Sequence, residues 1–125
     1  MGVWGPGNFQ RDAALDYMSS DIVKPLVAKL REIVDNPTNA EPDDPTADEV
    51  MVAVEILCVL CERCRAVPPG PGLVEECRSI YLKVWDGYID RLSPKPEYKK
   101  ERRDIIEASF AELARLAHKW HEVDP

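Results

Sequence analysis

The stretch that decides the fold is residues 46–67, which read TADEVMVAVEILCVLCERCRAV. Between Val50 and Cys61 every residue except Glu55 is apolar. A surface helix has a polar face about as wide as its apolar face, and this segment does not. The run is also shorter than the roughly 20 apolar residues that a membrane span needs. The sequence therefore predicts a central helix over 47–67 that the other elements surround on most sides.

Local signals mark both ends of this predicted helix. Thr46 is followed three residues later by Glu49, which is the capping-box pattern that satisfies free N–H groups at a helix start. Residues 68–72 read PPGPG, and no helix continues through them.

Length and composition indicate an ordinary globular protein. The chain has 125 residues, of which 45% are hydrophobic and 31% charged, and this suits a single domain over 1–125. The formal net charge of −7 argues against nucleic acid and against an anionic membrane as partners. The start of the chain lacks the pattern of a secretory signal peptide, so we expect a cytoplasmic protein whose four cysteines stay reduced.

Four further helices are predicted from the 3.6-residue spacing of apolar side chains. They cover 11–18, 21–35, 73–92 and 96–121. Pro25 is tolerable in the first turn of the second helix, but residues 11–35 could also form one long helix kinked near Pro25. The predicted fold class is an all-α bundle of four long helices plus a short N-terminal one.

The first nine residues cannot be helical, because three glycines and a proline lie close together. They predict a compact hook that packs on the core through its aromatic residues, Trp4 and Phe9. The opening pattern M-G-x-W-G-x-G-x-F-x-x-D-x-A-L-D-aromatic resembles the start of a family of small bacterial proteins, the domain of unknown function 4259. The resemblance implies a related fold, and it implies no activity, cofactor or catalytic residue. The residues after Met1 that carry this motif are Gly2, Trp4, Gly5, Gly7, Phe9, Asp12 and Asp16.

Glu55 is a candidate buried acid. Asp48, Glu55 and Glu62 are seven residues apart and form one narrow acidic strip on the predicted central helix. The simpler interpretation is that this strip faces water, because charges are seldom buried without a partner. The alternative is that Glu55 is partly buried and pairs with a cation: Arg11, Lys24 or the α-amino group of Gly2 after removal of Met1.

The cysteines are the only candidates for metal chemistry. Cys58, Cys61 and Cys64 are spaced by two residues, and Cys77 lies beyond the Pro/Gly loop. Zinc and iron–sulfur sites use closely spaced thiolates, but on a helix these three sulfurs spread over about 120° of arc. The sequence favours the interpretation that they are small apolar core residues, so that no metal is bound.

No enzyme template fits the sequence, which contains no P-loop, nucleophile elbow or HExxH motif. We therefore expect a protein without cofactor or catalytic residues that binds a protein partner, with the acidic segment 41–49 as one candidate surface. The alternative hypothesis is a small metal- or thiol-dependent protein that uses the four cysteines, and it requires bound metal or a thiol of lowered pKa.

Overall fold

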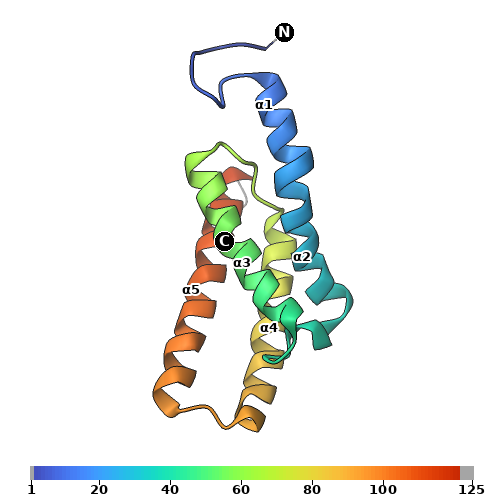
Figure 1. Ribbon diagram of the computed structural model, residues 1–125, viewed down its shortest axis with the longest axis vertical. Helices are drawn as coiled ribbons and strands as arrows, with labels where there is room; N and C mark the ends of the chain where they lie inside the picture. Colours follow the sequence, from blue (N-terminus) through green and yellow to red (C-terminus); the bar gives the residue numbers. More distant parts are fainter. Residues whose placement is uncertain (1, 122–125) are drawn as a thin grey trace.

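The computed structural model describes residues 2–121, and the chain in this range is an all-α bundle, as predicted (Figure 1). Short 3₁₀ turns at Pro37–Ala40 and Ile89–Leu92 join some of the helices. The helices are α1 (Asp12–Tyr17), α2 (Lys24–Asp35), α3 (Pro45–Arg63), α4 (Pro71–Tyr88) and α5 (Pro96–Trp120).

α1 and α2 form one continuous rod. A π-helical segment, Met18–Val23, joins them and ends just before Pro25. Proline has no N–H group and its ring collides with the carbonyl four residues earlier, so a regular α-helix could not pass through this point undisturbed. The wider π-helical turn keeps the chain helical there. The alternative of one long helix is therefore the observed one, and its upper end, α1, extends above the other helices (Figure 1).

α3 begins and ends at points that differ from the predicted ones. The carboxylate of Asp44 accepts a hydrogen bond from the backbone N–H of Thr46 at 2.8 Å, so Asp44 is the cap and the predicted capping box is wrong. At the other end, Arg65 has a φ of 60°, which terminates the helix four residues earlier than predicted. The Ala66 N–H then donates to the Leu60 carbonyl at 3.1 Å.

The core lies between the inner faces of α2, α3, α4 and α5. At its centre the rings of Tyr81 and Phe110 lie 5.5 Å apart, and the Tyr81 hydroxyl donates to the backbone carbonyl of Ala47 at 3.0 Å. The other large side chains that are fully buried come from all four helices: Leu30, Ile33, Val50, Val54, Leu57, Val74, Cys77, Ile106 and Leu113.

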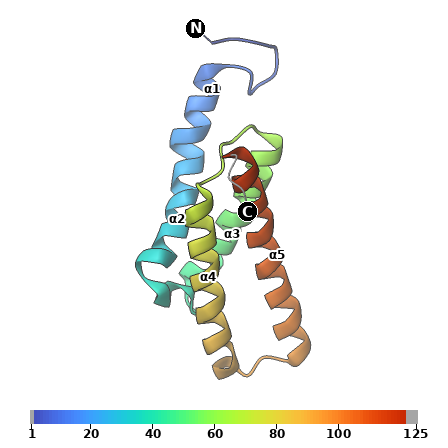
Figure 2. The same cartoon turned by 180° about the vertical axis from the view of Figure 1, so that it is seen from behind.

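α3 is not surrounded on most sides, and this prediction is wrong. Val52, Ile56 and Val59 are 58%, 40% and 51% exposed. Figure 1 shows α3 in front of α4, with α2 and α5 beside it, and Figure 2 shows the same bundle from behind with α4 in front. A helix of a four-helix bundle buries only the sector that faces its neighbours, so the outer face of α3 stays in water although it is apolar.

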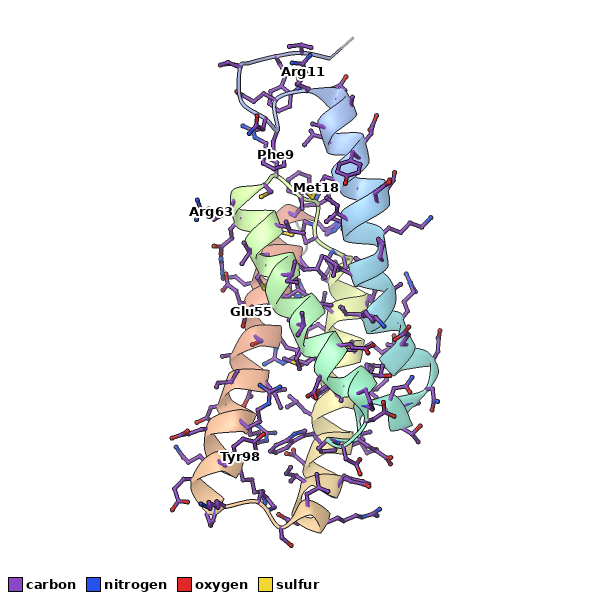
Figure 3. All side chains as sticks on the ribbon, in the orientation of Figure 1. Phe9, Arg11, Met18, Glu55, Arg63 and Tyr98 are labelled. Carbon is purple, nitrogen blue, oxygen red and sulfur yellow. The ribbon has the colours of Figure 1, made fainter. Side chains whose placement is uncertain are left out.

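The N-terminal hook lies above the upper end of the bundle (Figure 1). The Trp4 N–H donates to the Gln10 carbonyl at 3.0 Å, and the Asp12 N–H donates to the Gly2 carbonyl at 2.7 Å, so the segment folds back on itself. Phe9 points toward the bundle and packs against the core (Figure 3). Trp4 does not enter the core as predicted. It is 45% exposed, and the Arg65 guanidinium lies 4.8 Å from its ring.

Candidate binding groove between α3 and α5

Two exposed apolar strips lie on α3 and α5. Val52, Ile56 and Val59 follow one another at i, i+4 and i+7 on α3, so they lie along one face of that helix. On α5, Tyr98 and Ile105 are seven residues apart and are 56% and 52% exposed. Their spacing places them on one strip of α5 as well.

Two cavities lie beside these helices, one between α3 and α5 and one that also borders α4. The first, about 320 Å³, is lined by residues of α3, with Arg102 of α5 as the opposite wall. The second, about 200 Å³, lies toward the lower end of the bundle and includes Tyr98 of α5. Both cavities include Asp48 and Arg102, so they adjoin one another. We call the first cavity, together with the exposed α3 strip beside it, the α3–α5 groove. The cavity is lined by Asp48, Met51, Val52, Glu55, Ile56 and Arg102, and Val59 continues the strip further along α3.

Among the described residues, Asp48 and Glu55 in the groove form no ion pair, whereas Glu62 and Arg115 above it are paired. At the upper end, Arg115 of α5 contacts Glu62 of α3 at 3.2 Å and Glu112 at 2.6 Å. The hydrogen bond from Arg115 holds the pKa of Glu112 at about 2. This bridge ties α3 to α5 above the groove.

Glu55 is exposed on the groove side of α3, near the middle of the helix (Figure 3). The structure does not bury it, and it makes no ion pair with Arg11 or Lys24. The hypothesis of a buried acid is wrong, and the solvent-facing interpretation of the acidic strip is the correct one.

The four cysteines are free thiols in the positions expected of core residues. Cys77 is buried, and Cys58, Cys61 and Cys64 are half-buried. Burial raises the pKa of Cys58 and of Cys77 to about 12 and that of Cys61 to about 11, so these thiols are protonated at neutral pH. In the part of the chain that the structure describes, no three metal-ligating side chains come together. Protonated thiols are weak nucleophiles and weak ligands, which counts against the thiol-dependent alternative.

The motif residues of the hook are held by Gln10, which the sequence did not single out. The Gly7 N–H donates to the Gln10 side-chain oxygen at 2.7 Å. A Cβ at Gly5 would lie 2.5 Å from the same side chain, and a Cβ at Gly2 would collide with the Asp12 carboxylate. Asp12 and Asp16 are exposed on α1. Met1 of the motif lies outside the described residues.

Most acidic side chains of the segment 41–49 already have partners within the fold. Asp43 accepts a hydrogen bond from the Tyr88 hydroxyl at 3.1 Å, Asp44 caps α3, and Glu49 pairs with Lys29 at 2.7 Å. Asp48 is the residue of this segment that lines the groove.

The groove residue on α5 was missed because the sequence around 99–103 reads as a solvated charged face. Exposed apolar side chains recur at Tyr98 and Ile105 on the same helix, outside its main apolar stripe, and they are the sequence signal nearest to the groove. Arg102 carries no such signal, since its position depends on how α3 and α5 pack.

The fold and the groove define a small helical-bundle protein with an unpartnered apolar face. The chain matches the family described as a domain of unknown function (DUF4259) over residues 2–124, and it belongs to that family. No curated protein and no solved structure matches it. Within residues 2–121, no helix has the length and apolar character required to cross a membrane.

Proposed function

We propose that the protein is a single-domain, non-catalytic cytosolic binding protein, and that its α3–α5 groove receives a basic amphipathic helix of a partner protein. The observation that carries the proposal is the exposed strip Val52, Ile56 and Val59 beside the carboxylates of Asp48 and Glu55, which form no ion pair within residues 2–121. An amphipathic helix that lies in a groove presents apolar anchors at i, i+3 or i+4 and i+7, and this strip has the same spacing.

Charge indicates the kind of partner. Asp48 and Glu55 lie along the groove without an ion pair in the described residues, and the whole chain has a formal net charge of −7. The groove holds these two carboxylates against the one guanidinium of Arg102, so two copies of this acidic chain that met through it would bring together more negative than positive charge. A helix with lysine or arginine beside its apolar face would instead neutralise them.

The chemistry of the thiols supports a non-catalytic role in the cytosol. All four cysteines are free, which is typical of proteins in a reducing compartment. The raised pKa values of Cys58, Cys61 and Cys77 suit side chains that pack, because a catalytic thiol needs a lowered pKa.

The test uses a synthetic helical peptide of leucine and lysine, labelled for fluorescence anisotropy, and an otherwise identical peptide in which glutamate replaces lysine. We expect the basic peptide to bind and the acidic one not to bind. The combined variant Val52→Asp and Val59→Asp should weaken binding at least tenfold, because charged side chains would then lie under the apolar face of the peptide.

The matched control is Val67→Asp, which changes an exposed valine in the loop after α3, outside the groove. This variant should bind the basic peptide as the unchanged chain does. Equal weakening by the groove variant and the control, or self-association of the chain through the groove in sedimentation, would overturn the proposal. Circular dichroism confirms that each variant is folded.

A further inference from the structure

The two helices on either side of the α3–α5 groove run in the same direction. Asp48 and Arg102, in the N-terminal parts of α3 and α5, line one cavity. In the C-terminal parts of the same helices, Glu62 contacts Arg115 at 3.2 Å. Both helices therefore run from the lower to the upper part of the bundle (Figure 1). Because the C-terminal end of a helix carries a partial negative charge, both negative ends lie at the upper end of the groove.

The exposed apolar strip of α3 ends at a cation. Arg63 lies four residues after Val59, so it continues the strip by one helical turn. It is exposed at the upper end of α3 (Figure 3), and within residues 2–121 it forms no ion pair. The neighbouring Glu62 pairs with Arg115 instead. The charge of Arg63 is therefore available to a group that lies at the upper end of the strip.

The lower part of the strip is acidic. Asp48 and Glu55 lie on the side of the strip that faces α5, because both line the cavity that includes Arg102. The guanidinium of Arg102 offsets only one of these two negative charges. The groove is thus negative at its lower end and positive at its upper end, and the distance from Asp48 to Arg63 along the helix axis is about 22 Å at 1.5 Å for each residue.

We propose that the docked partner helix runs antiparallel to α3 and α5, with acidic side chains in its first turn beside Arg63 and lysine or arginine in its second half beside Asp48 and Glu55. This proposal rests on helix docking in the groove, and it adds the direction of the partner helix and the order of its charges. The positive N-terminal end of the partner helix then lies beside the negative ends of α3 and α5, and the side-chain charges favour the same direction.

The test uses two synthetic peptides of about 16 residues, which is the length that spans the groove. They have the same composition and the same leucine anchors, and hydrocarbon staples hold both in helical form. The forward peptide has glutamates in its first turn and lysines in its second half, whereas the reversed peptide has the lysines first and the glutamates last. In fluorescence anisotropy at physiological ionic strength, we expect the forward peptide to bind about threefold more tightly or better.

Charge reversal at Arg63 should change the two affinities in opposite senses. Arg63→Glu should weaken the forward peptide by about threefold and strengthen the reversed peptide by a similar factor, as expected for one exposed charge pair. The matched control Arg31→Glu makes the same change of charge at an exposed position of α2, outside the groove, and should alter neither affinity. Circular dichroism confirms that both variants are folded. Equal changes for the two peptides would overturn the proposed direction.

A nitroxide at the N-terminus of the forward peptide reports the direction itself. It should broaden the amide signals near Arg63 more strongly than those near Asp48, and a nitroxide at the C-terminus should give the opposite pattern. The reverse order of broadening, or equal broadening at both ends, would overturn antiparallel docking while the proposed function stands. Failure of both peptides to bind the folded chain would overturn the proposed function as well.

Discussion

At the residue scale, Gln10 organises the hook. Its side-chain oxygen accepts the hydrogen bond from the Gly7 N–H, and its side chain fills the space that a Cβ at Gly5 would need. The glycines of the motif are thus required by a neighbouring side chain, and neither Gly5 nor Gly7 has a positive φ. This pairing explains why small residues recur in the segment.

A double-mutant cycle on Gly5 and Gln10 tests this pairing. Gly5→Ala should displace the Gln10 side chain and free the Gly7 N–H, so that hydrogen exchange at Gly7 becomes faster. The same substitution in a Gln10→Ala background should change that exchange little, because the collision partner is gone. The free energy of unfolding should change by less than about 0.5 kcal/mol, as is usual for substitutions outside the core. Additive effects of the two substitutions would contradict the pairing.

At the scale of elements, α3 has two apolar faces with different roles. Leu57 faces the core and is fully buried, whereas Val59, two residues later, is half-exposed on the groove. Both side chains are apolar, but only that of Leu57 is removed from water completely, so it contributes more to the stability of the fold than Val59 does. The outer face remains available for a partner, which is the basis of the proposed function.

Alanine substitutions at these two positions should therefore differ strongly. Leu57→Ala is expected to lower the free energy of unfolding by about 2–5 kcal/mol, because it leaves a cavity in the core. Val59→Ala should lower it by less than about 0.5 kcal/mol, and the better helix propensity of alanine could offset even that loss. Urea denaturation of both variants measures the difference. Similar losses in both would show that the outer face of α3 is covered.

At the scale of the whole molecule, buried acids with raised pKa values make the fold sensitive to alkali. Burial raises the pKa of Cys77 to about 12 from an ordinary value of 9.0, and it raises the pKa of Tyr81 as well. The folded chain therefore holds these protons at a pH where the unfolded chain has lost them. Their contribution to stability is complete below pH 9 and is lost as the pH rises toward the folded value.

We expect the free energy of unfolding to fall as the pH rises from 9 to 11, measured by urea denaturation with a reductant present. A fully shifted group such as Cys77 contributes a slope of at most about 1.4 kcal/mol per pH unit. Cys77→Ala should make the slope shallower. Val74→Ala is the matched control, because it also truncates a buried side chain of α4 but removes no titrating group. Identical slopes in the two variants would exclude a role for the Cys77 proton.

The sequence predicted the features that depend on interactions between residues close together in the chain, such as the position of a helix. The prediction of a helix over 96–121 agrees with the observed α5, Pro96–Trp120. It succeeds because the start of the helix and its apolar stripe can both be recognised from residues close together in the sequence. The end of α3 was missed, because the left-handed residue there is Arg65 and glycine is the usual signal. The groove was missed because nothing local distinguishes Val52, which is exposed, from Val54, which is buried. That difference arises only when α2, α4 and α5 pack.

The π-helical segment Met18–Val23 sets the direction in which the N-terminal arm points. An α-helix turns by about 100° with each residue, so one residue gained or lost in this segment would rotate the arm around the rod by a comparable angle. The segment lies at the level where the rod leaves the bundle (Figure 1), and its buried residues Met18 and Val23 hold it to the core. A change in chain length within this segment would therefore change the direction, around the axis of the rod, in which the exposed indole of Trp4 points.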